Sequence, residues 1–422
     1  MDARFLGFDN ILETLGINSS KSFQLVYNEA LSKYESEGLN IAGCVWAPMQ
    51  ADFSYSWLEA DGRISAMATY VDLNSEPVAR GKNVELSKVE GTIPRQKRKI
   101  VKGENDYRKE ITALNDADTA ARLMGRSPFN SVREYLAKYF FDTLAEIPAS
   151  HAASLSYARG QMFGARALTL TDENNPSGLQ MTFKSEVPAA NVDNTKFYTV
   201  DSLGAVTYVT DVDPILNLRK KVRSLKNDPY HGYPLVTVEI NAKSFFTLIE
   251  HPLILQRIGY AEDWKLEITA KGQSAANANA AAQKVGFEKL LSNSDEFAKN
   301  WFKAAIGADE LIVDTTIVGV DKLNAVTKRF DTNALSAFPE GVILVRPSGD
   351  VAQIFNVACL RPDASAVISA EIFGGRGIVE YFYDARTRTQ TWISELTALP
   401  VPTRPKDLYY FEFVGVTPGV GG

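Results

Sequence analysis

The chain has 422 residues, of which 45% are hydrophobic and 23% are charged, as in an ordinary globular protein. Its formal net charge of −6 argues against general nucleic-acid affinity, which needs clustered Lys and Arg to displace counterions. Its two cysteines make neither a disulfide framework nor a metal-ligand spacing, and no apolar run reaches the roughly 18 residues of a membrane span. These features favour a reduced cytoplasmic setting, and the length suggests roughly two or three domains.

Residues 1–60 are predicted to form an N-terminal arm. A helical pattern at 21–37 is followed by an aromatic segment, 41–60, that includes Trp46 and Trp57. Because so thin a segment cannot make a core alone, its aromatic side chains must pack on another surface. That surface is either the body of the same chain or a neighbouring subunit, which makes Trp46 and Trp57 candidate contacts between subunits.

Residues 61–110 alternate polar and apolar side chains with few large hydrophobes, which predicts a long two-stranded β-ribbon. An isolated ribbon is marginal in water, so it needs another surface to lie on. Deletion of residues 62–108 is therefore expected to leave a folded subunit that no longer assembles.

The predicted ribbon ends in a basic run, RQKRK (95–99). A charged and solvated strand face is the simplest interpretation. The functional alternative is that the basic side chains meet carboxylates on a neighbouring copy, and it gives four candidate contacts: Arg95, Lys97, Arg98 and Lys99. Nucleic-acid binding ranks third, because no aromatic side chains are interleaved as a stacking platform requires.

A long amphipathic helix is predicted to begin at Ser127-Pro128, since apolar residues recur at spacings of three and four from Val132 onward. Pro148 removes one backbone hydrogen bond and should kink or split this helix. Gly160 and Gly164 are expected to mark its end. A strand, a turn rich in Asn, Pro and Gly, and a second strand are predicted to follow.

An α/β body is predicted from residue 201 onward. Asp213-Pro214 is a good helix start, whereas the Ala/Asn run 275–283 is most simply a loop that enters a helix. ELIVDTTIVGV (310–320) is predicted to be one strand. LPVPTRP (399–405) is predicted to be a rigid extended linker between the last two strands.

No phosphate-binding, dinucleotide-binding, nucleophile-elbow or zinc motif is found in the sequence. His151 lies on the stripe of the long helix and is predicted to be a core or interface histidine rather than a catalytic base. His231 lies in a turn sequence, and His251 before a proline is predicted to be a cap or loop group. GGRG (374–377) is more simply a flexible turn than an anion cradle. No catalytic residue, metal or cofactor is therefore predicted.

The order of these elements resembles the major capsid protein of tailed bacteriophages, with its Hong Kong 97-like fold. Four segments carry the resemblance: YARGQMFGARALTL (157–170), TDVDPILNL (210–218), VTVEINAKSFFTLIEHPLILQRI (236–258) and RTQTWISELTALPVPTRPKDLYYFEF (388–413). The chain departs from the family at Pro148, and at Tyr208, where many relatives carry a tryptophan. Some relatives cross-link Lys to Asn between subunits, but no pair can be assigned to that role in this sequence.

The resemblance implies an α+β fold in six parts. These are an N-terminal arm (1–60), an extended loop (61–110), a peripheral domain with a spine helix (111–200), an axial domain (201–375), peripheral return strands (376–415) and a flexible tail (416–422).

The implied function is structural, with no enzymatic activity and no cofactor. The chain would self-assemble into hexamers and pentamers of an icosahedral shell that encloses double-stranded DNA in a virion, assembled in the host cytoplasm. Scaffolding, portal and decoration proteins would be separate partners, and the acidic balance suits a shell that does not grip DNA.

Two alternatives remain open. The same fold could form an encapsulin-like compartment around a cargo enzyme. A cytoplasmic hydrolase is a further alternative, and it predicts a pocket with converging polar groups and a strongly perturbed ionisable residue.

Overall fold

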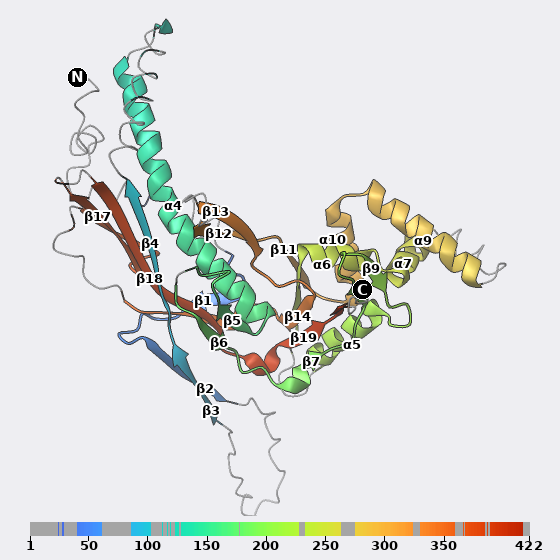
Figure 1. The fold of residues 1–422 in the computed structure, drawn as a ribbon. Helices are drawn as coiled ribbons and strands as arrows, with labels where there is room; N and C mark the ends of the chain where they lie inside the picture. Colours follow the sequence, from blue (N-terminus) through green and yellow to red (C-terminus); the bar gives the residue numbers. More distant parts are fainter. Residues whose placement is uncertain are drawn as a thin grey trace, which may run out of the picture.

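The computed structural model describes residues 24, 28, 40–60, 86–102, 112, 116, 119, 123–125, 128–176, 178–227, 233–262, 275–323, 330–358, 366, 368–384, 386 and 389–416. Helices and sheets are mixed in two lobes, which confirms the predicted α+β class (Figure 1). No helix in these ranges combines the length and apolar character needed to cross a membrane. The domain boundaries expected from the sequence stay predictions.

The first lobe is a mostly antiparallel sheet covered on one face by a long helix (Figure 1). Its elements are α4 (Pro128–Gly164), β1 (Cys44–Trp46), β4 (Arg95–Lys102), β15 (Ala352–Asn356), β16 (Ile368–Ile372), β17 (Gly377–Asp384) and β18 (Thr389–Pro402). β18 is central, because it pairs antiparallel with β4, β15 and β17. Ile147, Leu155 and Phe163 of α4 share one buried cluster with Trp392 and Leu396 of β18.

Helix α4 continues through Pro148, so of the two predicted effects, a kink or a split, the split does not occur (Figure 1). A proline inside a helix removes one backbone hydrogen bond. The 37-residue helix α4 nevertheless continues on both sides of Pro148. Just beyond it, the Ser150 hydroxyl donates to the Ile147 carbonyl at 2.7 Å. Residues 128–145 are described as backbone only, so the apolar stripe predicted for that half lies outside the described side chains. Beyond it the stripe is confirmed, with Leu155 and Met162 buried.

Gly160 does not end α4 but lies inside it, where the helix touches the chain before β14 (Val342–Pro347). A Cβ at this position would lie 2.3 Å from the Ala337 carbonyl oxygen. Gly160→Ala is therefore expected to destabilise the protein by about 1–3 kcal/mol through overpacking, although alanine is the better helix former. Thermal unfolding checks this, with Ser154→Ala on the exposed face of α4 as the control. A melting temperature raised by Gly160→Ala would contradict the close approach.

The predicted ribbon corresponds only in part to the observed strands. β2 (Ser54–Ala60) and β3 (Leu86–Thr92) form an antiparallel hairpin, and residues 61–85 between them lie outside the described ranges. The RQKRK run is not part of this ribbon: it forms β4, which pairs with β18 inside the sheet. Deleting residues 62–108 would therefore remove a strand of the first lobe's sheet as well as the ribbon, so this deletion does not test the ribbon alone.

Three further small sheets flank the lobes. They are β5 (Ala167–Leu170) with β6 (Met181–Lys184), β12 (Ile317–Leu323) with β13 (Phe330–Ser336), and β8 (Tyr198–Val200) between β9 (Val206–Tyr208) and β20 (Val414–Val416). The prediction of a single strand at 310–320 is wrong, because this segment forms two strands that belong to different sheets. It breaks after β11 (Glu310–Asp314), where Asp314 Oδ1 accepts a hydrogen bond from the Thr316 amide at 2.7 Å and turns the chain.

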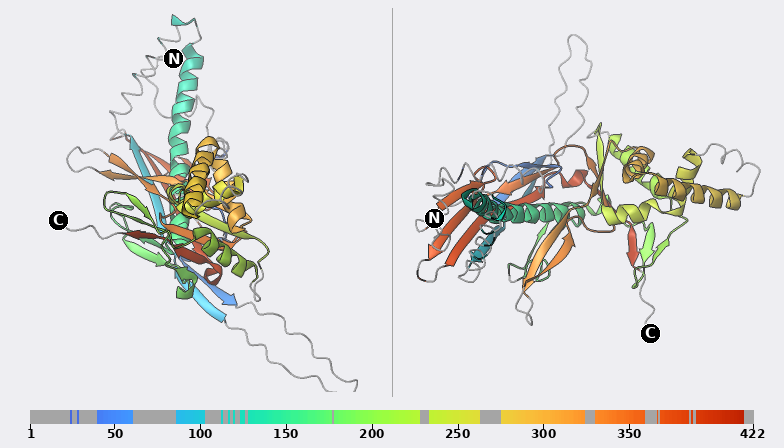
Figure 2. Two further views of the ribbon diagram at one scale, coloured as in Figure 1. Left: turned by 90° about the vertical axis from the view of Figure 1, so that its right-hand side faces the viewer. Right: turned by 90° about the horizontal axis from the view of Figure 1, so that it is seen from above.

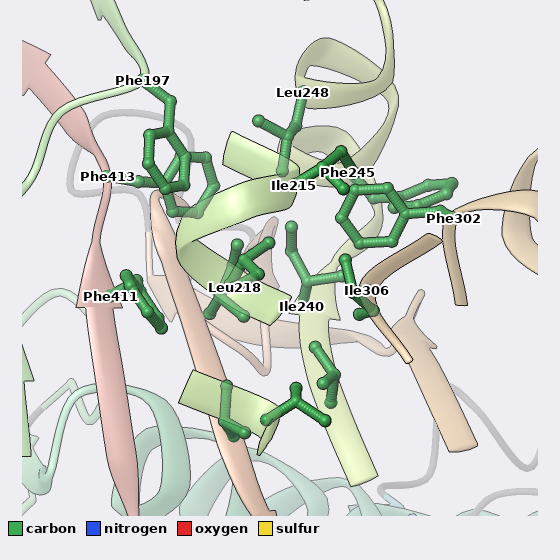
Figure 3. Close-up of a cluster of buried hydrophobic side chains, with 14 of the residues drawn as sticks. Phe197, Ile215, Leu218, Ile240, Phe245, Leu248, Phe302, Ile306, Phe411 and Phe413 are labelled. Atoms are coloured by element: carbon green, nitrogen blue, oxygen red, sulfur yellow. The ribbon is translucent and has the colours of Figure 1, made fainter. Parts of the chain in front are cut away.

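The second lobe has a five-stranded sheet covered by helices. Its strands run in the order β11, β10 (Val236–Asn241), β14, β19 (Tyr409–Glu412) and β7 (Val192–Asp193). Its helices are η2 (Ala189–Asn191), α5 (Pro214–Lys226), α6 (Ala242–Ile249), α7 (Pro252–Glu262), α9 (Ala275–Ser292) and α10 (Asp295–Ile306). Figure 3 shows Phe245 and Phe302 beside Ile240 and Leu218, where helices meet the sheet. The start of α5 is as predicted: Asp213 caps it by accepting from the Leu216 amide.

The Ala/Asn run 275–283 is helical, as the first half of α9, so the loop predicted there is wrong. Alanine is the best helix former, and contact with α7 further stabilises this helix. A Cβ at Gly259 of α7 would lie 2.1 Å from the Ala282 carbonyl oxygen, and one at Gly286 would lie 2.1 Å from that of Leu255. The two helices thus pack backbone to backbone, which only small residues permit.

The linker predicted at 399–405 is wrong for its first four residues, which complete β18. Pro400 pairs with Ile354 and Pro402 with Ala352 of β15. Proline is tolerated where a strand pairs on one side, because its missing N–H can face away from the ladder. A short 3-10 helix, η3 (Pro405–Asp407), then leads into β19.

Candidate functional site

The basic strand β4 meets carboxylates of its own chain. The Arg95 guanidinium contacts both carboxylate oxygens of Glu395 on β18. Lys97 Nζ lies 3.7 Å from Glu395 Oε2 and keeps 53% of its side chain exposed. The carboxylate of Glu395 therefore pairs with both Arg95 and Lys97, and Lys97 is the more exposed of the two.

Arg98 on the other face of β4 joins three elements. Its Nη2 lies 2.9 Å from Glu146 Oε1 of α4, and its Nη1 lies 3.4 Å from Asp321 Oδ2 of β12. Lys99 is exposed. The described partners of the run thus lie within the same chain, and contact of Arg95, Lys97, Arg98 and Lys99 with a neighbouring copy stays a prediction.

Trp46 lies half-buried on the first lobe. The Arg376 guanidinium carbon is 4.8 Å from its ring centroid, and the ring of Phe373 is 6.3 Å away. Trp46 therefore packs on the body of its own chain, which is one of the two surfaces predicted for the aromatic side chains of the arm. Trp57 is placed by backbone register opposite Val89 in the hairpin, but its side chain lies outside the described residues.

A cavity of about 580 Å³ lies between α4, β4, β12 and the turn that joins β5 to β6. His151 and Tyr157 of α4 line it, together with Asn174 of the turn. The Nε2 atom of His151 is 2.9 Å from the Ser394 hydroxyl oxygen. Burial, and then the positive charge of Arg98, lower the pKa of His151 to about 4.

A serine beside a neutral histidine is the pairing that nucleophilic catalysis needs. Ser394, however, is fully buried within β18 and is not among the residues that line the cavity. In the described part of the chain, no group of three or more His, Cys, Asp and Glu side chains could hold a metal ion. The described geometry therefore fits the prediction that His151 is a core histidine.

His251 has the predicted capping role. It is fully buried, its Nδ1 accepts from the Leu253 amide at 3.2 Å, and its Nε2 lies 3.1 Å from the Val209 carbonyl oxygen. Burial lowers the pKa of His251. His231 lies outside the described residues. GGRG (374–377) forms the predicted turn before β17, with Gly374 and Gly375 at positive φ.

The most strongly built polar site is one that sequence reasoning missed. Arg159 of α4 is fully buried, and its guanidinium contacts both carboxylate oxygens of Glu239 on β10, with Nη2 2.7 Å from Oε2. Its Nη1 is 3.4 Å from Asp314 Oδ2 at the end of β11. Arg346 of β14 is the second buried arginine, and both guanidinium groups lie over the ring of Phe163.

An N-terminal strap, residues 40–44, completes this cluster. The Ala42 carbonyl oxygen accepts from Arg159 Nε at 3.1 Å and from Nη2 at 2.8 Å. The backbone N–H of Asn40 donates to the Ser156 hydroxyl oxygen of α4 at 2.9 Å. Gly43 has φ 79°, and a Cβ there would be 2.9 Å from the Arg346 guanidinium, so glycine is required twice over. The strap therefore binds to α4 and encloses the buried charges.

Cys44 follows the strap and is also buried. Burial raises the pKa of its thiol to about 12, so the reactive thiolate is not populated near neutral pH. Cys359 lies outside the described residues. The described cysteine is thus a small core residue.

No family model matches this sequence, and no curated protein matches it. Solved structures do match. The chain is similar to the capsid of cyanophage P-SCSP1u, with 10% identity, a TM-score of 0.42 and coverage of 89% of this chain and 86% of that chain. For the procapsid of satellite phage P4 the identity is 10%, the TM-score 0.42 and the coverage 87% and 85%.

A phage-related protein from Bordetella bronchiseptica matches with 12% identity, a TM-score of 0.37 and coverage of 92% of this chain and 95% of that chain.

Proposed function

We propose that this chain is a structural protein, the major capsid subunit of a phage-like shell. Copies of it would form hexamers and pentamers of a closed icosahedral particle around double-stranded DNA, and its location would be the virion. Scaffolding, portal and decoration proteins would be separate chains. No enzymatic activity is part of the proposal.

The observation that carries the proposal is the β2–β3 hairpin. It pairs with no other strand in the described ranges and projects from the body, on the side opposite to the first turns of α4 (Figure 2). Its base is anchored where Tyr55 stacks on Phe355, with ring centroids 4.9 Å apart. Because a lone two-stranded ribbon is marginal in water, a surface of another copy is the natural support.

The other small sheets point the same way. Met181 of β6 is 46% exposed and Ile317 of β12 is 70% exposed, so these ribbons carry apolar side chains into solvent. Individually weak contacts of this kind become strong when many copies engage together. An acidic net charge of −6 suits a wall that encloses DNA without binding it tightly.

Replacement of residues 57–89 by Asn-Gly tests the proposal. Ser56 and Glu90 are paired across the hairpin, so a two-residue turn can join them without disturbing β4 or the anchor at Tyr55. We expect a subunit with unchanged circular dichroism and melting temperature that forms no closed particles by electron microscopy and sedimentation.

Ser56→Ala is the matched control, since Ser56 is exposed and its backbone pairing is retained, and it should assemble normally. Shells of normal size from the shortened variant would contradict the role of the hairpin. If the wild-type chain itself stays a single subunit at high concentration, the shell proposal fails. Nuclease-protected DNA inside purified particles separates a virion head from an encapsulin-like compartment, which would contain a protein cargo.

A further inference from the structure

Glu239 lies between two buried arginines that belong to different lobes. Arg159 reaches it from α4 of the first lobe, with Nη2 2.7 Å from Oε2. Arg346 shares the sheet of Glu239 in the second lobe, and its Nε lies 3.7 Å from the same oxygen. A distance of 3.7 Å is too long for a hydrogen bond. The Glu239 carboxylate therefore bonds to Arg159 of the other lobe and not to Arg346.

The two arginines differ in how well their donors are satisfied. The Nε, Nη1 and Nη2 atoms of Arg159 all have acceptors, on Ala42, Glu239 or Asp314. Arg346 donates from Nη1 to its neighbouring carbonyls, but its buried Nε has no hydrogen-bond partner. A buried donor without an acceptor is unfavourable, so Arg346 Nε is a ready second partner for Glu239.

The strand register fixes this second partner in place. Arg346 pairs directly with Thr237 in the antiparallel ladder of β10 and β14, so Glu239, two residues further along β10, is its diagonal neighbour on the same face. This arrangement belongs to one sheet and does not depend on where α4 lies. Arg159, in turn, is also bonded to the strap, which is attached to α4 through Ser156.

We propose that Glu239 is a two-position carboxylate that can bond to either of the two buried arginines. In the described position it bonds to Arg159 and joins α4 to the second lobe. In the other position it bonds to Arg346 Nε, while Arg159 keeps the Ala42 carbonyl. Breaking a buried ion pair normally leaves an uncompensated charge, and a second partner within reach would compensate Glu239 when its bond to Arg159 is lost.

The structure of Arg159→Met tests the proposal directly. The variant removes the first partner, so a Glu239 carboxylate oxygen should approach Arg346 Nε to within about 3.2 Å. A carboxylate that stays in place, with Nε still unbonded, would overturn it. If Arg159→Met does not fold, Arg159→Gln gives the same readout, because its neutral amide cannot compensate the carboxylate charge and Arg346 is then the remaining arginine beside Glu239.

Thermal unfolding provides a second measurement. Arg159→Met should lower the melting temperature more in an Arg346→Met background than in the wild-type background, because the fallback partner is then missing. Equal losses in the two backgrounds would overturn the proposal. Both measurements can be made on the unassembled subunit, so they stand or fall independently of the shell function.

Discussion

Leu248→Asp is expected to unfold the second lobe. Leu248 of α6 is fully buried beside Phe245 in the core between the helices and the sheet (Figure 3). A carboxylate there has no basic partner within the apolar cluster, and burying an unpaired charge costs several kcal/mol, on the order of the whole stability of a domain. We expect insoluble protein, or a soluble chain that has lost the cooperative melting of this lobe.

The matched control is Phe246→Asp on the same helix. Phe246 is 37% exposed, so its substituted carboxylate can stay in water, and the cost should be much smaller. Circular dichroism and calorimetry of the two variants give the comparison. Equal stability of Leu248→Asp and Phe246→Asp would show that α6 does not bury the face described here.

Local patterns predicted elements whose own side chains decide their structure. The start of α5 at Asp213 follows from capping chemistry, which acts over a few residues. The second half of α4 follows from the apolar spacing that buries Leu155 and Met162. Such features need no knowledge of the distant chain.

The errors arose where distant contacts decide. The 275–283 run is helical because α9 packs closely on α7, where Gly259 lets the two backbones approach. No local pattern in the run reveals this contact. The RQKRK strand is predicted to end the ribbon because residues 61–110 alternate polar and apolar side chains with few large hydrophobes. In the structure, β18 supplies its ladder and Glu395 supplies part of its charge compensation.

The buried cluster was missed for a related reason. Arg159 lies on the apolar stripe of α4, and Glu239 interrupts a run of Val and Ile in β10. Glu239 alternates with Val238 and Ile240, so the strand pattern alone does not mark it as buried. Arg159 is a charged residue at a position that the helix pattern marks as buried, and a buried charge requires a partner. That signal was present in the sequence, but the pairing across 80 residues of chain required the fold.

Acidification is expected to destabilise the first lobe through His151. Its pKa falls from 6.5 in the unfolded chain to about 4 in the fold, so between these values only the unfolded chain binds the proton. The stabilisation is complete above pH 6.5 and is lost as pH falls toward 4. The shift corresponds to about 3 kcal/mol.

His151→Gln tests this origin. Glutamine can still hydrogen-bond to Ser394 but does not titrate, so the slope of unfolding free energy against pH should become shallower between pH 6.5 and 4. It should not vanish, because burial lowers the pKa of His251 as well. Denaturant unfolding at a series of pH values measures both slopes. Parallel curves for wild type and variant would mean that His151 is not buried as a neutral imidazole, and the packing of α4 against β18 would need revision.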